Sequence, residues 1–528
     1  PTFPQDTGAH STSPPHHEQK VVVAMNRSCG ILLHITSLPS RYGIGTLGQA
    51  AYDFVDFLHA AGQSYWQILP IGPTGYGDSP YQSFSTFAGN PYLIDLDRLI
   101  RQSWLTPAEV SAFPWAQHPG QVDFSLLYQQ RLPLLRRAYE RFRKAPPASF
   151  SHFCQAEQDW LEEYALFMAI KAQFGNGPWT SWPQALRLRK PEALARARAS
   201  LAEEQNFHRF LQYEFYRQWD ALRAYAREKG VKMIGDIPIY VPLDSADLWC
   251  SPELFQLDHD RQPLCVAGCP PDSFSQEGQY WGNPLYDWSR MERDGFAWWL
   301  RRIAAAGRLF DVIRIDHFRG FESYWSIPAE ADSARAGAWV KGPGMKLIRR
   351  IKERFPHLDF IAEDLGFLTD AVREMVAQSG FPGMKVLEFA FDSREPSDYL
   401  PHRYGENCVC YTGTHDNATL SQWCRESPPE TLAYAREYLH LSPSEDLAAA
   451  LLRSGLASKA NLFVAQMQDY LGLGGGARMN EPGTLKPENW RWCCTKDQLT
   501  GTLARRLRAE AETSCRIPLP TEMKSGVD

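Results

Sequence analysis

Residues 311–316 read Asp-Val-Ile-Arg-Ile-Asp, a short run of β-branched residues bounded by acids. Apolar runs of similar length recur at residues 31–35, 66–70, 232–237, 359–364, 384–389, 408–412 and 462–466. Continuous apolar runs are typical of parallel strands that are covered on both faces. Eight of them alternating with helical patterns predict a (β/α)8 TIM barrel rather than an open doubly wound sheet.

The spacing of these runs is uneven, which predicts where the barrel is interrupted. We expect residues 25–528 to form a single barrel with a helical insertion at about 95–230 and a loop-rich insertion at about 240–305. Both follow a strand, and segments that follow a strand lie at the carboxyl end of a barrel, where active sites are found. The insertions should therefore surround the site.

Composition excludes several classes of protein. The 528 residues carry a formal charge of −6, so no basic surface for nucleic acid or an anionic membrane is indicated. The 11 cysteines follow no repeated metal or disulfide pattern and predict reduced thiols. Aromatic residues make up 13% of the chain, and flat rings serve both as core and as surfaces on which sugars stack.

The first 24 residues are rich in Pro, Ser, Thr, Gln and His and show no periodicity. We expect residues 1–24 to be an extension, a tag or a processed leader. No run approaches the ~20 apolar residues of a membrane-spanning helix. The expected location is the cytoplasm, or the plastid stroma if residues 1–24 are a trimmed transit peptide.

Acids stand where several of the predicted strands end. Asp236, Asp316 and Glu363 each close an apolar run, and Asp416 lies just beyond another. One such acid alone is more often a helix cap or a turn former. Several acids at one rim of a barrel instead predict a catalytic cluster, because desolvation there tunes the pKa of each carboxyl.

Paired carboxylates serve glycoside chemistry with retention or inversion, depending on how far apart they lie. Arg314 is two residues before Asp316 and therefore points to the same face of the strand, where it can keep that carboxylate ionised. His317 and His415 adjoin two of the acids and could donate hydrogen bonds to sugar hydroxyls. Either histidine alone is more often structural.

The segments that carry these residues resemble those of the amylomaltases, the 4-α-glucanotransferases or disproportionating enzymes of glycoside hydrolase family 77. Three segments carry the acids: Arg-Ile-Asp-His-Phe-Arg-Gly at 314–320, Ile-Ala-Glu-Asp-Leu-Gly at 361–366 and Thr-Gly-Thr-His-Asp-Asn at 412–417. Further segments follow in the family's order at residues 30–39, 77–84, 235–241, 280–284 and 478–483. The resemblance implies a TIM barrel without a carboxy-terminal β-sandwich domain.

The resemblance also implies catalytic roles. Asp316 would be the nucleophile that forms a covalent glucosyl-enzyme, and Glu363 the general acid and then base. Asp416 would bind the 2- and 3-hydroxyls and stabilise the transition state, with Arg314 and His415 in support.

Five more residues would bind substrate by the same resemblance. Tyr81 would stack on the donor sugar, while Asp236 and His317 would line the same subsite. Trp281 would lie on the acceptor side, and Asn480 would make a further sugar contact.

The activity implied is disproportionation of α-1,4-glucans such as maltooligosaccharides and amylose, with a glucan, glucose or maltose as acceptor and with cyclisation as a further outcome. The reaction needs no cofactor and no metal, and no nucleic acid or membrane partner is expected. Two alternatives remain open: an α-glucan hydrolase, in which water outcompetes the acceptor, and a non-catalytic glycan-binding barrel. The oligomeric state is not indicated.

Overall fold

The computed structural model describes residues 26–517, apart from residues 76, 117, 119, 272–275, 367, 393 and 395–396. The expected extension at residues 1–24 therefore lies outside the described residues. Within that range no helix is both long and apolar enough to cross a membrane.

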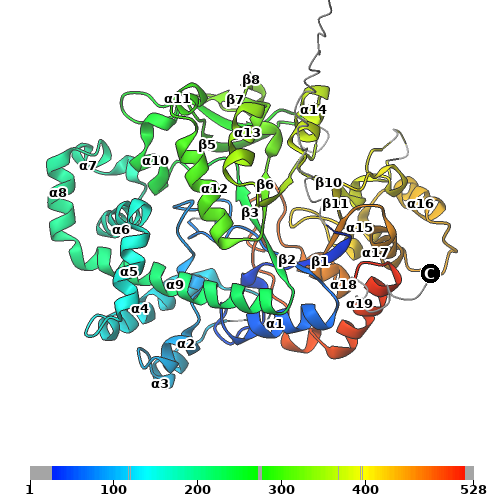
Figure 1. Ribbon diagram of the computed structural model, residues 1–528, viewed down its shortest axis with the longest axis horizontal. Coiled ribbons are helices and arrows are strands. Elements are labelled where there is room, and N and C mark those ends of the chain that lie inside the picture. The colour runs from blue at the N-terminus through cyan, green and yellow to red at the C-terminus, as the bar shows by residue number, and fades with distance from the viewer. Residues whose placement is uncertain are drawn as a thin grey trace, which may run out of the picture.

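Eight parallel strands close into a barrel, which confirms the predicted fold (Figure 1). In barrel order they are β1 (Ser28–Leu32), β12 (Leu462–Gln466), β11 (Cys408–Tyr411), β10 (Gly383–Val386), β9 (Asp359–Ala362), β6 (Val312–Asp316), β3 (Lys232–Pro238) and β2 (Tyr65–Gln67). Each of the eight apolar runs in the sequence overlaps one of these strands, although β1 begins three residues before its run. The strands are almost entirely buried because helices cover them outside and side chains fill the interior.

Small residues allow close packing around the barrel wall. Gly235 in β3 lies under the ring of Phe310, and a Cβ atom there would come within 2.1 Å of that ring. Only glycine fits at this position without displacing the aromatic ring.

The outer layer contains helices that follow the strands. They are α1 (Gln49–Ala60), α11 (Trp288–Arg293), α12 (Ala297–Leu309), α13 (Met345–Arg354), α14 (Asp370–Ser379), α15 (Leu420–Glu426), α16 (Pro429–Tyr438), α17 (Leu447–Ala457), α18 (Met467–Tyr470) and α19 (Gly501–Thr513). Helix α19 packs against α1 and α17 and so covers the seam where the first and last strands pair.

A group of helices stands between β2 and β3 and extends to one side of the barrel (Figure 1). They are α2 (Leu96–Arg101), α3 (Pro107–Ser111), α4 (Phe124–Phe142), α5 (Ala148–Ala156), α6 (Gln158–Gln173), α7 (Gln184–Arg187), α8 (Pro191–Ser200) and α9 (Ala202–Glu228). Helix α9 ties this group to the barrel, because Phe215 and Trp219 belong to the same continuous core as the barrel strands.

A small four-stranded sheet follows β3 in the chain. Its order is β5 (Gln279–Pro284), β4 (Cys265–Cys269), β7 (Ser323–Pro328) and β8 (Ala338–Lys341), and all its pairs are antiparallel. Helix α10 (Ala246–Cys250) precedes it. The region expected to be loop-rich thus contributes β4 and β5, and β7 and β8 come from the segment after β6.

Candidate active site

The acids predicted from the sequence meet at the carboxyl end of the barrel. Asp236 lies in β3, Asp316 ends β6, and Glu363 follows β9 directly. The backbone N–H of Glu363 donates to the carbonyl of Ile315, 3.1 Å away, so the strand pairing itself places Glu363 beside Asp316. Neighbouring strands that end at the same level bring side chains from distant parts of the sequence into one cluster.

Arg314 lies between two of these carboxylates. Its guanidinium is buried and donates from Nη1 to Asp236 Oδ2 at 2.6 Å and to Asp316 Oδ1 at 2.9 Å. Asp236 and Arg314 are direct partners in the β3–β6 pairing, while Arg314 and Asp316 share one face of β6. One fixed cation thereby orients both carboxylates.

Asp316 and Glu363 are held in different protonation states. Burial raises the pKa of Asp316 to about 6, and the nearby Arg314 opposes that rise. Burial, together with the charge of Asp316, raises the pKa of Glu363 to about 8. At neutral pH the first group is therefore mainly ionised and the second mainly protonated, the combination that a nucleophile and a general acid require.

Backbone groups fix the orientation of Glu363. The N–H of His317 donates to Glu363 Oε2 at 2.6 Å, and the N–H of Leu365 donates to Oε1 at 2.8 Å. His317 can donate in this way because its backbone is left-handed, with φ +54°, an uncommon conformation for a residue other than glycine. Local strain at His317 therefore accompanies the placement of the acid.

The ring of His317 lies against that of Trp281 of β5. The two rings lie 4.8 Å apart and nearly perpendicular. Burial, followed by the charge of Arg319, lowers the pKa of His317 to about 3, so the ring is neutral. Its buried Nε2 has no hydrogen-bond partner among the described residues, which leaves this atom available to a ligand hydroxyl.

Asp416 lies in the loop after β11 and is held from two sides. Asn480 donates from Nδ2 to Asp416 Oδ1 at 2.6 Å, and His415 Nε2 lies 3.3 Å from the same oxygen. Arg478 donates to the backbone carbonyls of Asp416 and Asn480, which locks the two loops together. The side chain of Asp416 remains 42% exposed, so its other oxygen faces open space.

Tyr81 completes the cluster from the loop after β2. Its hydroxyl donates to Asp236 Oδ2 at 2.8 Å, and its ring stacks on His415 with centroids 5.0 Å apart. Trp490 lies within 6.0 Å of both rings. All ten residues singled out from the sequence are thus linked to the acid cluster by hydrogen bonds, ring contacts or direct strand pairing. Trp490 and Arg478 also belong to the cluster and were not predicted.

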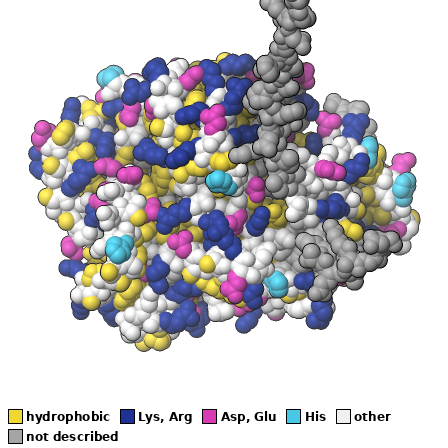
Figure 2. Space-filling view, viewed as in Figure 1, with side chains coloured by type: hydrophobic (Ala, Val, Ile, Leu, Met, Phe, Trp, Pro, Cys, Tyr) yellow, Lys and Arg dark blue, Asp and Glu magenta, His cyan; other side chains and the backbone are white. Residues whose placement is uncertain are grey.

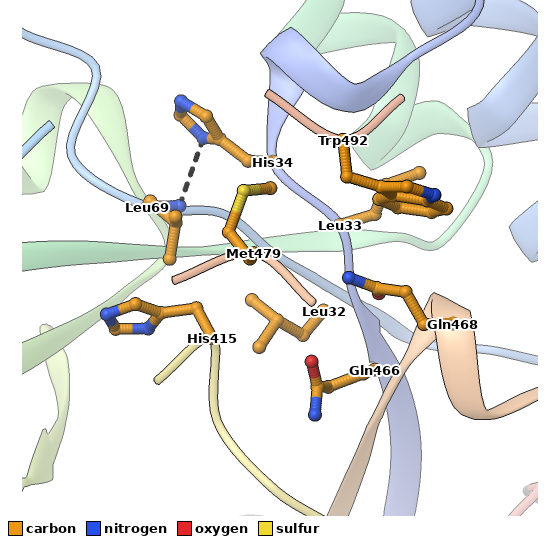
Figure 3. Close-up of a pocket in the computed structure, with 9 residues that line it drawn as sticks. All are labelled: Leu32, Leu33, His34, Leu69, His415, Gln466, Gln468, Met479 and Trp492. Atoms are coloured by element: carbon orange, nitrogen blue, oxygen red, sulfur yellow. Dashed lines mark hydrogen bonds between the residues drawn. The ribbon is translucent and has the colours of Figure 1, made fainter. Parts of the chain in front are cut away.

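Buried side chains surround a small pocket beside His415 (Figure 3). His34 accepts a hydrogen bond at Nδ1 from the backbone N–H of Leu69, 3.2 Å away. Burial, followed by the charge of His415, lowers the pKa of His34 to about 3. A cavity of about 10 Å³, room for one water molecule, lies between His34, His415 and Gln466. The pocket is therefore small, and His34 beside it is neutral.

Two further acids lie beneath the loop that carries Asp416. Asp469 accepts from Thr412 Oγ1 at 2.6 Å and from the N–H of Leu420 at 2.8 Å, and burial raises its pKa to about 7. Burial, followed by the charge of Asp469, raises the pKa of Glu388 well above its usual range. Glu388 lies two residues beyond the end of β10, at the same rim as the predicted acids.

The predicted loop-rich insertion at about 240–305 is not described at residues 272–275. Among the described residues, no group of three or more His, Cys, Asp or Glu side chains is arranged to hold a metal ion.

Comparison with known proteins identifies relatives along nearly the whole chain. A family model described as 4-alpha-glucanotransferase matches residues 33–498. The 4-alpha-glucanotransferase of Thermus thermophilus is 49% identical over 503 residues, which cover 93% of this chain and 99% of that protein. The one from Streptococcus pneumoniae serotype 4 is 49% identical over 477 residues, covering 90% of this chain and 94% of that protein.

The fold agrees with a solved relative. The amylomaltase from Streptococcus agalactiae, solved in complex with acarbose, superposes with a TM-score of 0.91 at 42% identity and covers 93% of this chain and 100% of its own. The family predicted from the sequence is thereby confirmed. The chain belongs to the 4-alpha-glucanotransferase family, glycoside hydrolase family 77.

Proposed function

We propose that this chain carries out the family's α-1,4-glucan transfer by a retaining double displacement in which Asp316 is the nucleophile and Glu363 is the acid and base. The observation that carries the assignment is that the Arg314 guanidinium donates to Asp316 Oδ1 at 2.9 Å, whereas Glu363 accepts hydrogen bonds from the backbone N–H groups of His317 and Leu365. Arg314 supports the ionised form of the first, while burial and the charge of Asp316 support the protonated form of the second.

In the first step Glu363 gives its proton to the glycosidic oxygen while Asp316 attacks the anomeric carbon. The bond between that carbon and the leaving glucan breaks, and a β-linked glucosyl-enzyme forms. In the second step the ionised Glu363 takes the proton from the 4-hydroxyl of an acceptor, whose oxygen attacks the same carbon and releases Asp316. Two inversions give net retention.

Asp416 would accept hydrogen bonds from the 2- and 3-hydroxyls of the reacting sugar. The contacts from Asn480 and His415 fix one carboxylate oxygen and leave the other exposed to the cleft. Asn480 thus contributes by positioning Asp416, in addition to the direct sugar contact expected from the sequence. Such preorganised groups lower the barrier because they need no reorientation during the reaction.

The remaining residues would bind sugars on either side of the cleavage point. Tyr81 offers a ring already fixed by Asp236 and by stacking on His415. Trp281 would lie on the acceptor side, and the unpartnered Nε2 of His317, whose ring lies against Trp281, would bind a hydroxyl of the donor sugar. We propose that the helical and loop-rich insertions form the walls of this cleft, that glucose and maltose also serve as acceptors, and that the protein acts in the cytoplasm.

The test is a product profile. With maltotriose alone, the wild-type protein should release glucose and form maltopentaose and longer glucans. Asp316→Asn should lower kcat by at least about 10⁴-fold, because no covalent intermediate can form. Asp332→Asn removes an exposed carboxylate and should leave the profile unchanged.

Two outcomes would contradict the proposal. Products limited to glucose and maltose, with no longer glucans, would indicate the alternative α-glucan hydrolase. Binding of maltooligosaccharides without any turnover in the wild-type protein would indicate the glycan-binding barrel.

A further inference from the structure

We propose that the four-stranded sheet carries a second glucan-binding surface, which receives the part of a long α-1,4-glucan chain that extends beyond the acceptor side of the active site. We call this surface the aromatic platform and define it as Tyr280 of β5, Trp325 of β7 and Trp339 of β8. The inference rests on the proposed function, because it names where a long substrate of that reaction would lie.

The strand register places the three rings in one row. Tyr280 is paired with Gly268 of β4, Gly268 is paired with Trp325, and Trp325 is paired with Trp339. Directly paired residues of an antiparallel sheet lie on the same face. The row therefore crosses the whole sheet, three strand spacings or about 14 Å, and Gly268 leaves a gap without a side chain between Tyr280 and Trp325.

The platform is unusually exposed for aromatic side chains. Trp339 is 43% exposed, the largest exposed fraction of any tryptophan in the part of the chain that the structure describes, and Tyr280 is 47% exposed. Of the seven large hydrophobic side chains that are exposed within that part, Tyr280 and Trp339 belong to the platform and Leu264 directly precedes β4. A cluster of this kind is typical of a binding surface.

The platform is continuous with the active site through Arg319. The guanidinium carbon of Arg319 lies 4.1 Å from the centre of the Trp339 ring, and Arg319 is two residues beyond His317. The backbone of His317 in turn binds Glu363, the residue proposed to protonate the leaving glucan. Because Glu363 would protonate the leaving glucan, the leaving and acceptor glucans would lie on its side of the cleavage point. The contacts that run from Glu363 through His317 and Arg319 to Trp339 therefore place the platform on the acceptor side. Figure 1 shows β7 and β8 at the edge of the molecule beyond β6.

The charges around the platform favour a neutral polymer. Lys341 pairs with Glu322 at the end of β8, and Arg335 pairs with Glu277. Both of these exposed cations thus have an anion as partner, and basic and acidic side chains are interspersed on the face of the molecule shown in Figure 2. Flat aromatic faces without net charge suit the C–H faces of glucose rings.

The stack on Trp339 is preorganised. Trp325 meets Trp339 edge to face with centroids 5.2 Å apart, and Trp325 Nε1 donates to the carbonyl of Ala334 at 2.8 Å. A ring held in this way loses little conformational freedom when a sugar stacks on it. We therefore place the strongest contact at Trp339 and a weaker one at Tyr280.

The test compares kcat/KM on amylose, a long chain that can extend over the platform, with kcat/KM on maltotriose, a chain of only three sugars. Trp339→Ala should lower the amylose-to-maltotriose ratio by about three- to tenfold, as expected for one exposed stacking contact. Tyr280→Ala should lower it less, and Trp339→Phe should retain most of it. The matched control is Phe174→Ala, an aromatic residue of similar exposure at the end of α6, which should leave the ratio unchanged.

Binding without turnover supplies the second measurement. In the Asp316→Asn background, Trp339→Ala should migrate faster than its parent through a gel that contains amylose, and equally fast through a gel without it.

An unchanged kcat/KM ratio and unchanged migration would overturn the proposed platform. An equal loss of kcat/KM on both substrates would also overturn it, since that would indicate a distorted cleft. If Trp339→Ala only changes the oligomeric state in size-exclusion chromatography, the face is an interface between copies and the proposal is wrong. Full turnover by Asp316→Asn would instead overturn the proposed function, so the two failures are distinguishable.

Discussion

Two buried clusters, the acids at the carboxyl end of the barrel and Arg516 at the amino end, differ in how completely their polar atoms are hydrogen-bonded. At the carboxyl end, polar groups are buried without complete satisfaction: Asp236 Oδ1, His317 Nε2 and Glu388 Oε1 have no hydrogen-bond partner among the described residues. At the amino end, Arg516 is fully buried and all three of its guanidinium nitrogens donate to carbonyls, including that of Ser28 at the start of β1.

This contrast separates stability from reactivity within one fold. A buried polar atom without a partner costs free energy, whereas a satisfied buried cation holds segments together. Arg516 binds carbonyls of the segment 455–461 as well as Ser28, so it closes the seam between β12 and β1. The unsatisfied polar atoms at the carboxyl end lower the free energy of unfolding but can bind substrate. The hydrogen bonds of Arg516 at the amino end raise the free energy of unfolding.

The largest effect is expected at the carboxyl end, from Glu363→Gln. Loss of the general acid should lower kcat on maltotriose by about 10³-fold. α-Maltosyl fluoride has a leaving group that needs no proton, so with this donor the variant should still form a glucosyl-enzyme, detectable by mass spectrometry. A carboxyl whose folded-state pKa is raised costs stability at every pH above its ordinary value, so thermal stability should stay unchanged or increase.

The control for Glu363→Gln is Asp316→Asn with the same fluoride donor, which should form no covalent adduct. An adduct on Asp316→Asn, or none on Glu363→Gln, would reverse the two assignments. A large loss of stability in Glu363→Gln would show that the carboxyl end stabilises the barrel, contrary to the comparison.

The second effect is expected at the amino end, from Arg516→Leu. The variant leaves several buried carbonyls without donors and should lose about 3 kcal/mol of stability. The activity of the molecules that remain folded should be unchanged, because Arg516 lies at the end of the barrel away from the acids. The midpoint of urea unfolding and kcat at low temperature measure the two quantities separately.

Arg505→Leu is the matched control, since Arg505 is an exposed arginine of α19 that donates a hydrogen bond to Thr502 in the same helix. It should leave both quantities near the wild-type values. A fall in kcat for folded Arg516→Leu comparable to its loss of stability would mean that the two ends are coupled.

The barrel could be predicted because its physical cause is local. Parallel strands that are buried on both faces need continuous apolar runs, and each of the eight runs in the sequence overlaps a barrel strand. The acids could be predicted by a related rule, since a charge at a strand end faces a cleft rather than the interior. Asp316 and Glu363 meet this criterion, whereas Asp236 lies inside β3, two residues before its end, and is buried against Arg314.

The parts that were not predicted depend on tertiary contacts. Glu388 also lies just beyond a strand end. The apolar run at 384–389 extends past it, so the sequence did not show that β10 ends at Val386. The sheet β5-β4-β7-β8 joins segments on either side of β6 through pairings that no local pattern reveals, and its strands are short. Trp490 contacts Tyr81 across some 400 residues of sequence, and Arg516 reaches Ser28 across 488 residues.

The third and smallest effect is the pH dependence, which tests whether the carboxyl end is poised as described. Asp316 must be ionised to attack, so kcat/KM should fall about tenfold for each pH unit below its pKa of about 6. Glu363 must be protonated to act as the acid, so kcat/KM should fall about tenfold for each unit above its pKa of about 8. The profile on maltotriose should therefore be a bell with its maximum near neutral pH.

With α-maltosyl fluoride as donor, Glu363→Gln should lose the alkaline limb of the pH profile for glycosyl-enzyme formation and keep the acid limb, because only the nucleophile still titrates. If both limbs persist in Glu363→Gln, another group controls the alkaline side, and the assignment of the raised pKa to the catalytic acid is wrong.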